Sequence, residues 1–304
     1  MSKTFCVQPW LGKELYVDGT TSQCCWLSNN PNMDQVRKDL LNDVQSPDCA
    51  KCWRAESSGQ VSRRMQQNIL ADTLYDLSIE NIQTMCERNE HSLSIYQLGT
   101  SNTCNGACIM CGPGASSKWQ SLLKQYDKQE TPMPDIDYNN AKFVEFLGGE
   151  PLLDQKNTEI LKKLNKECVI SFVTNGSIDI KQELIDLLVT FKKLIVCFSI
   201  DGIGPVYEYQ RWPLKWNKLL ENLEKFKQLD CELSVSYTLT NVNLPYKQQT
   251  IDWFTSQNLE YIINEVTWPE CLNPNKPINE KTIQELDRQD ALKGIDRRDY
   301  GFNF

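Results

Sequence analysis

From residue 94 onward, short apolar runs alternate with stretches whose apolar residues recur at helical spacing. The apolar runs, rich in β-branched and aromatic residues, predict six strands, at 94–99, 141–149, 168–176, 192–202, 231–240 and 258–266. Apolar residues three and four apart predict the intervening helices, at 116–126, 154–165, 181–191, 213–228 and 246–256. Strands that alternate with helices are typical of parallel βαβ units, so we expect an α/β fold.

The first 90 residues follow a different pattern. Two short strand-like pieces flank Asp18-Gly19, a pair that favours a hairpin turn. A polar stretch, the segment "PDCAKCW" and a long helical region from about 62 to 88 come next. We therefore expect a small cysteine-rich module at 1–60 and a helical linker at 61–91, ahead of a core domain at 92–270. The tail at 271–304 is open to three interpretations: a lid, a partner contact or a disordered segment.

Composition and charge narrow the class of protein. The 304 residues are 40% hydrophobic and 24% charged, as in a globular protein, and the net charge is −8. This charge gives no overall attraction to a phosphate backbone, so a nucleic-acid partner is disfavoured. No stretch approaches the roughly 20 apolar residues of a membrane helix, and "MSKTFCVQPW" lacks the apolar core of a signal peptide. We expect a cytoplasmic protein with no membrane partner.

Thirteen cysteines against a single histidine, His91, restrict the chemistry. In a reducing compartment such thiols favour metal binding or catalysis over disulfides, and thiolate-rich sites select zinc or iron–sulfur clusters. Cys104, Cys108 and Cys111 lie in one loop after the first predicted strand. A 4Fe–4S cluster on three thiolates keeps one iron open for another molecule. Zinc with three cysteines and an open position is the alternative.

Polar or glycine-rich motifs follow the next strands as well. They are Gly148-Gly149-Glu150, Thr174-Asn175-Gly176, and Ser199 with Asp201. The carboxyl ends of parallel strands meet at the same edge of a barrel, where functional groups gather. We therefore expect these motifs and the cysteine loop to form one site.

The spacing C-x3-C-x2-C, followed by "FLGGEPLL", "FVTNG" and "FSIDG" at successive strand ends, closely resembles the radical S-adenosylmethionine (radical SAM) superfamily. The resemblance covers roughly residues 92 to 270 and implies a partial (β/α)6 TIM-like barrel. It implies that Cys104, Cys108 and Cys111 hold a 4Fe–4S cluster whose open iron binds the methionine end of S-adenosylmethionine. It also implies a set of cofactor-binding residues: Gly148, Gly149, Glu150, Thr174, Asn175, Ser199, Asp201 and Arg211.

The same resemblance assigns roles within that set. Gly148-Gly149-Glu150 matches the motif that receives the methionine amino group, since glycines allow close approach of the backbone and a carboxylate suits an ammonium. The polar residues after the third and fourth strands match positions on the ribose and carboxylate side of the cofactor. Arg211, in "YEYQRWP", pairs with that carboxylate or, alternatively, lies on a helix surface. Met110, where an aromatic residue is frequent in the family, is able to pack on an adenine ring.

The N-terminal cysteines resemble a second feature of some radical SAM enzymes, an auxiliary-cluster domain of the twitch or SPASM type. The spacing of Gly19 relative to the cysteines on either side carries this resemblance. It implies a second 4Fe–4S cluster on Cys6, Cys24, Cys49 and Cys52, with Cys25 as an alternative to Cys24. In the family this domain usually follows the barrel, whereas here it precedes it. A four-cysteine structural zinc site suits the same residues.

The resemblance implies an enzyme that cleaves S-adenosylmethionine to methionine and a 5′-deoxyadenosyl radical, which abstracts a hydrogen atom from a peptide or small-molecule substrate. An electron donor such as a flavodoxin or ferredoxin is the implied partner. The second cluster accepts the electron left after abstraction or, alternatively, binds the substrate through an open iron; four cysteine ligands favour electron transfer. Two alternatives remain: a zinc-binding interaction protein on an α/β scaffold, and a radical SAM enzyme that modifies nucleic acid. The sequence identifies neither the substrate nor the oligomeric state.

Overall fold

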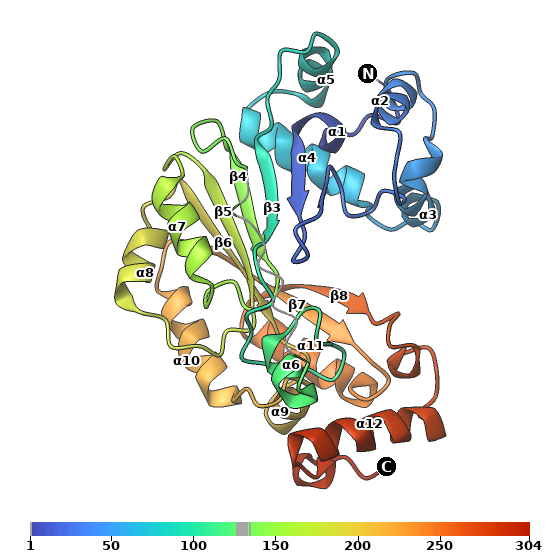
Figure 1. Cartoon of the computed structure of the whole chain (residues 1–304), viewed down its shortest axis with the longest axis vertical. Coiled ribbons are helices and arrows are strands. Elements are labelled where there is room, and N and C mark those ends of the chain that lie inside the picture. The colour runs from blue at the N-terminus through green and yellow to red at the C-terminus, as the bar shows by residue number, and fades with distance from the viewer. Residues whose placement is uncertain (1, 126–132, 134) are drawn as a thin grey trace. The chain divides into compact units, whose positions relative to one another are not determined.

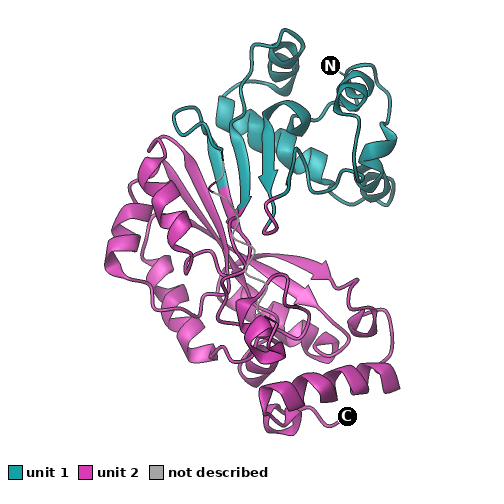
Figure 2. Ribbon diagram, viewed as in Figure 1, with its two compact units in different colours: residues 1–16, 20–98, 134–144 teal, residues 17–19, 99–133, 145–304 magenta. Residues whose placement is uncertain are grey.

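The computed structural model of the chain describes residues 2–125, 133 and 135–304 (Figure 1). The chain divides into two compact units (Figure 2). Unit 1 comprises residues 1–16, 20–98 and 134–144, and unit 2 comprises residues 17–19, 99–133 and 145–304. The expected domain boundaries at residues 60, 91 and 270 stay predictions.

Among the described residues, eight strands form a mostly parallel sheet in the order β2-β1-β3-β4-β5-β6-β7-β8. The six strands predicted from residue 94 onward are all present. The α/β class is therefore confirmed, and the sheet is consistent with a partial TIM-like barrel. The strands are β1 Gly12–Leu15, β2 Thr21–Ser22, β3 Ile95–Gly99, β4 Phe143–Leu147, β5 Val169–Thr174, β6 Lys193–Ser199, β7 Glu232–Leu239 and β8 Glu260–Glu265.

Unit 1 contains both strands of the predicted hairpin, β1 and β2, which pair antiparallel. Strand β1 also pairs in parallel with β3, Gly12 opposite Ile95 and Leu15 opposite Leu98. The hydrogen bonding of the cysteine-bearing segment thus continues into the first strand of the predicted core. Helices of unit 1 are α1 Gln8–Leu11, α2 Met33–Leu41, α3 Ala50–Ser57, α4 Arg63–Tyr75 and α5 Ile79–Glu87, with a 3-10 turn η1 at Pro47–Cys49.

The helical region predicted from about 62 to 88 is present as two helices, α4 and α5. Asp76 ends α4 in the left-handed conformation, with φ 52°. Ser78 then begins α5, because its side chain accepts a hydrogen bond from the backbone N–H of Asn81. A residue in the left-handed region commonly ends a helix, and a serine N-cap favours the start of the next one.

Unit 2 contains β5 to β8 as consecutive parallel neighbours. Its helices are α6 Ser117–Leu123, α7 Gln155–Lys163, α8 Gln182–Leu188, α9 Pro205–Gln210, α10 Trp216–Lys227, α11 Lys247–Ser256 and α12 Glu280–Lys293, with 3-10 turns η2 Leu244–Tyr246, η3 Glu270–Leu272 and η4 Arg297–Tyr300. The predicted helix 116–126 ends at Leu123, and residue 126 lies outside the described residues. The short helix α9 had no counterpart in the prediction. None of the described helices is long and apolar enough to cross a membrane.

Alternation along β6 shows which side of the sheet carries the site. Val196 and Phe198 are buried, whereas Cys197 and Ser199 are partly exposed. Phe198 packs edge-on against Phe226 of α10, with ring centroids 5.7 Å apart. The helices α7, α8 and α10 lie along this apolar side (Figure 1). The opposite side is therefore free to present polar groups such as Ser199.

The C-terminal segment is folded, and it packs into unit 2. Leu286 of α12 and Phe302 belong to one buried apolar cluster with Ile109 of the cysteine loop and Tyr209 of α9. Of the three interpretations left open for the tail, disorder does not apply to these residues.

Candidate active site

The three cysteines of the loop after β3 share one cavity. Its volume is about 410 Å³, and all its lining residues belong to unit 2. They are Cys104, Gly106, Cys108, Met110, Cys111, Ala115, Leu147, Gly148, Gly149, Val173, Asn175, Ser199, Arg211 and Thr238. Loops or strand ends that follow β3, β4, β5 and β6 thus meet at this cavity, as the position of the motifs predicted.

The cysteine loop is fixed by backbone hydrogen bonds to the end of α9. The N–H of Ala107 donates to the carbonyl of Trp212 at 2.6 Å, and the N–H of Ile109 donates to that of Gln210 at 2.9 Å. These bonds satisfy polar groups that the buried loop would otherwise leave unpaired. They also set the path of the chain between the three thiols.

Burial controls the protonation of these thiols. It raises the pKa of Cys104 to about 11 and that of Cys108 to about 12, and it also raises the pKa of Cys111. The nearby Arg211 guanidinium opposes this shift, because its positive charge lowers the pKa of all three thiols. Thiols with raised pKa values ionise readily only when a cationic centre, such as a metal ion, compensates the charge.

The Gly-Gly-Glu turn after β4 lies directly against the cysteine loop. The N–H groups of Gly149 and Glu150 donate to the carbonyls of Ser101 and Thr103, at 3.1 and 2.7 Å. Gly148 has φ +110°, and a Cβ there would stand 2.6 Å from the Ser101 oxygen. A Cβ on Gly149 would collide with the Thr103 carbonyl. Gly148 is therefore required by backbone conformation and by space, and Gly149 is required by space.

The Glu150 carboxylate points to the end of β5. Its two oxygens accept hydrogen bonds from the Thr174 hydroxyl and the Asn175 N–H, both at 2.7 Å, and from the Leu152 N–H at 3.2 Å. The side chain is buried, and burial raises the pKa of Glu150 to about 7 although these hydrogen bonds oppose the shift. Glu150 thus fastens the turn after β4 to the turn after β5.

Arg211 and Asp201 form an ion pair at the cavity. The Arg211 Nε lies 2.6 Å from Asp201 Oδ2, and the two side chains are 11% and 0% exposed. The other Asp201 oxygen accepts the Thr238 N–H at 2.7 Å. Burial alone would lower the pKa of Arg211, but the attraction of Asp201 outweighs it and the pKa is raised. Arg211 is therefore a largely buried cation beside the thiols and not a helix-surface arginine.

The structure separates the predicted site residues into two groups. Those that line the cavity are Cys104, Cys108, Cys111, Gly148, Gly149, Asn175, Ser199 and Arg211. Glu150, Thr174 and Asp201 are not lining residues; they are buried behind it and hold the others. The sequence analysis did not identify the other lining residues apart from Met110: Gly106, Ala115, Leu147, Val173 and Thr238. For Val173 and Thr238, the alternation of β5 and β7 was the available signal, because their inward-facing positions follow from the pleat.

A second group of thiols meets in unit 1. Cys6, Cys24, Cys49 and Cys52 line one cavity together with Gln8, Pro9, Trp26, Leu27 and Arg64. The segment before α1, the turn after β2 and the start of α3 contribute these cysteines. Cys25 is exposed and is not a lining residue.

These four thiols are also held in the protonated form. Burial raises the pKa of Cys6 and of Cys49 to about 12 each, and neighbouring thiolates would raise both further. Burial raises the pKa of Cys52, and the Arg64 N–H opposes it. A hydrogen bond with Cys25 and burial raise that of Cys24, whose sulfur accepts the Trp26 N–H at 3.5 Å. Over residues 2–125, 133 and 135–304, no three His, Cys, Asp or Glu side chains are placed to hold a single metal ion.

No curated protein sequence matches the chain significantly. Native anSMEcpe with bound AdoMet is 20% identical, with 67% of this chain and 62% of that chain covered and a TM-score of 0.43. Streptococcus suis SuiB bound to S-adenosylmethionine is 14% identical, with 88% and 61% covered and a TM-score of 0.44. The same protein bound to the precursor peptide SuiA is 13% identical, with 71% and 51% covered and a TM-score of 0.45.

The chain thus spans less than two thirds of the length of these solved structures. The family described as the radical SAM superfamily matches residues 98–254, more than half of the chain. The matched range includes the three-cysteine loop, the Gly-Gly-Glu turn and the strand ends up to Arg211. The chain belongs to the radical SAM superfamily of enzymes, as the resemblance of its motifs implied.

Proposed function

We propose that this enzyme binds a 4Fe–4S cluster through Cys104, Cys108 and Cys111, and that it uses S-adenosylmethionine for hydrogen-atom abstraction. The observation that carries the proposal is the meeting of three thiols, of which Cys108 is buried and the other two are partly buried, with a glycine turn and a largely buried cation around one cavity. Three ligands for four irons leave one iron open for a second molecule. When bound, the cluster and S-adenosylmethionine supply a 5′-deoxyadenosyl radical.

The residues of the chain bind and orient the cofactor. Gly148 and Gly149 have no side chains to fill the cavity, so they let a ligand approach the backbone. Arg211 supplies a positive charge suited to the carboxylate of the methionine end. Asn175 and Ser199 offer polar groups on the same cavity, and Met110 offers a thioether for an adenine ring.

Glu150, Thr174 and Asp201 act behind the cavity. Glu150 and Thr174 hold the turn that carries Asn175, and Asp201 holds the guanidinium of Arg211. In this proposal their part in cofactor binding is to place the lining residues, because their own polar atoms are already engaged within the protein.

We further propose an auxiliary 4Fe–4S cluster of the twitch or SPASM type in unit 1, on Cys6, Cys24, Cys49 and Cys52. Their shared cavity supports it, and the exposure of Cys25 favours Cys24 as the ligand. A 4Fe–4S cluster carries its irons at separate corners, so its thiolates surround a volume and do not converge on one point. Four protein ligands leave no iron open, so the auxiliary cluster serves electron transfer.

The remaining parts of the proposal concern setting and partners. The thiol-rich sites suit the reducing cytoplasm, where an electron donor such as a flavodoxin or ferredoxin reduces the cluster. The proposed substrate is a peptide or a small molecule, since the net charge of −8 disfavours nucleic acid.

Anaerobic reconstitution tests the proposal. The wild-type protein should form 5′-deoxyadenosine slowly without substrate, and the triple variant Cys104/Cys108/Cys111→Ala should lose both this activity and the iron of unit 2. Cys231→Ala is the matched control, because Cys231 lines neither thiol cavity. A triple variant that keeps its iron content and the cleavage of S-adenosylmethionine would overturn the assignment.

A further inference from the structure

The C-terminal helix α12 contacts the cysteine loop through a buried amide. The Gln289 side chain is 2% exposed, and its Nε2 donates to the carbonyl of Ile109 at 2.9 Å across 180 residues of sequence. Ile109 is fully buried and stands between the proposed ligands Cys108 and Cys111. An uncharged side chain of α12 thus fixes the peptide group that joins the two halves of the ligand loop.

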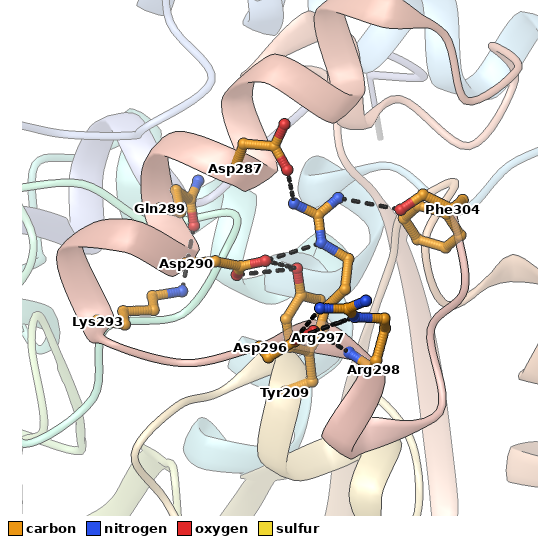
Figure 3. Close-up of polar contacts among 9 residues, drawn as sticks. All are labelled: Tyr209, Asp287, Gln289, Asp290, Lys293, Asp296, Arg297, Arg298 and Phe304. Carbon is orange, nitrogen blue, oxygen red and sulfur yellow. Dashed lines mark hydrogen bonds and ion pairs between the residues drawn. The ribbon is translucent and has the colours of Figure 1, made fainter.

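A buried lysine of the same helix lies behind this contact. Lys293 is 7% exposed, and its Nζ donates to Gln289 Oε1 at 3.2 Å (Figure 3). The ammonium also lies over the ring of Trp119, 5.0 Å from the centroid. The Trp119 Nε1 in turn donates to the carbonyl of Cys108 at 3.0 Å. Lys293 therefore contacts two side chains, Gln289 and Trp119, and each of them donates a hydrogen bond to the cysteine loop.

The charge of Lys293 has no ion-pair partner within the described residues. The two carboxylates nearest in its electrostatic surroundings are engaged elsewhere: Asp290 with Arg297, at 2.8 Å, and Glu285 with Arg288, at 2.6 Å. Burial lowers the pKa of Lys293 to about 8, and the largest attraction opposing this shift would come from Cys108 in its ionised form. A buried cation without a carboxylate partner destabilises the folded protein. A negative charge bound at the neighbouring cysteine loop would offset this cost.

The other polar contacts of this region explain why α12 is a firm support. Arg297 bridges Asp290 and Asp287, and it also donates to the carbonyl of Phe304 at 3.4 Å (Figure 3). The Tyr209 hydroxyl donates to Asp290 at 3.2 Å, which joins α12 to α9. Because α9 is also bonded to the cysteine loop, the helix, the loop and the C-terminal turn form one packed unit.

We propose that α12 supplies the outer surroundings of the cluster in unit 2: Gln289 fixes the ligand loop, and the Lys293 ammonium stabilises the extra negative charge of the reduced cluster. This inference rests on the proposed function. Reduction takes one electron from an external reductant and adds one negative charge to the cluster and its three thiolates. A cation in a poorly solvated interior stabilises such a charge more than it would in water, and cluster potentials follow net charge and hydrogen bonding.

Both residues are positioning residues, so the readout is the reduction potential and not activity. Anaerobically reconstituted full-length protein is titrated with dithionite and mediators, and the reduced cluster is followed by electron paramagnetic resonance (EPR). Only the signal that changes on addition of S-adenosylmethionine is scored, which separates the cluster in unit 2 from an auxiliary one. Lys293→Met should shift the midpoint potential downward, and Lys293→Arg should restore it. Lys281→Met, an exposed lysine of the same helix, is the control and should leave the midpoint unchanged.

An unchanged midpoint in Lys293→Met, with wild-type iron content and melting temperature, would overturn the charge role. If Lys293→Met loses the cluster, Lys293→Gln replaces it, with the same downward shift expected. Loss of iron in both neutral variants but not in Lys293→Arg would also support a need for the charge, whereas loss in all three would indicate a steric role and overturn it. Gln289→Leu should alter the shape of the same signal, and an unaltered spectrum would refute the part assigned to Gln289. Absence of any S-adenosylmethionine-sensitive signal in the wild type would refute the proposed function itself.

Discussion

Replacing Glu150 gives a direct test of how the cavity is built. The structure places its carboxylate behind the cavity, where three donors from the Thr174 hydroxyl and the N–H groups of Asn175 and Leu152 converge on it. Glu150→Ala removes the acceptor of all three. We therefore expect the variant to lose stability as well as affinity for S-adenosylmethionine, because the turn after β5 loses its anchor.

The magnitude follows from the number of donors left unpaired. A buried donor without a partner costs about 1 to 3 kcal/mol. With partial access of water from the cavity, Glu150→Ala should cost about 3 to 5 kcal/mol of unfolding free energy. Glu150→Gln keeps an oxygen for the Asn175 N–H, and its amide is able to donate to the Thr174 hydroxyl. The Leu152 N–H, which donates to the same oxygen as the Thr174 hydroxyl, loses its acceptor. The variant should therefore cost about 1 to 3 kcal/mol near neutral pH.

The same carboxyl predicts a pH dependence. Burial raises the pKa of Glu150 to about 7 from an ordinary value of 4.5. Because the folded state binds this proton more tightly than the unfolded state, the contribution of Glu150 is greatest below about pH 4.5 and is lost as the pH rises to about 7. The change amounts to about 3 kcal/mol. Glutamine does not titrate, so Glu150→Gln should be more destabilising at pH 5 than at pH 8.

Urea unfolding of the wild type and both variants at pH 5 and pH 8 measures these differences. Glu159→Ala, an exposed glutamate on α7, is the control. A wild-type unfolding free energy in Glu150→Ala would refute the anchoring role. A cost of Glu150→Gln that is the same at both pH values would refute the raised pKa.

Three further substitutions give distinct outcomes. Cys6→Ala should lower the iron content by about half, from about eight irons per chain, while substrate-free formation of 5′-deoxyadenosine persists; loss of all iron would mean that the two thiol groups are wrongly separated. Gly149→Ala should weaken S-adenosylmethionine binding in equilibrium dialysis, whereas Gly112→Ala, where a Cβ meets nothing within 4 Å, should not; equal affinities would contradict the close packing of the turn. Arg211→Ala leaves Asp201 buried without its cation and should cost about 3 to 5 kcal/mol in urea unfolding; a cost near zero would show that the pair does not hold the cavity.

The sequence predicted the elements whose signal is local. The strands from β3 to β8 appear as apolar runs, and the turns that follow them carry the cysteine loop and the glycine turn. Parallel strands end at one edge, so the convergence of the motifs on one cavity was also predictable. The break between α4 and α5 at Asp76 was harder to predict, since the apolar spacing continues across it and only the Ser78 cap indicates the start of α5.

The orientation of the side chains could not be predicted from the sequence. A glutamate after two glycines is equally suited to face a ligand or the protein, and the three donors that engage Glu150 come from two different turns. The contact of Gln289 with Ile109 joins residues 180 positions apart. No local pattern encodes a contact of that kind, because it depends on how α12 packs against the cysteine loop.

The most direct test of the central claim is the EPR spectrum of the reduced, anaerobically reconstituted protein with and without S-adenosylmethionine. A cluster with three protein ligands has an open iron, so the cofactor should change its signal. We predict a 4Fe–4S spectrum that shifts when S-adenosylmethionine is added and that disappears in the variant Cys104/Cys108/Cys111→Ala. Identical spectra with and without the cofactor, or a cofactor-sensitive signal that survives in the triple variant, would contradict it.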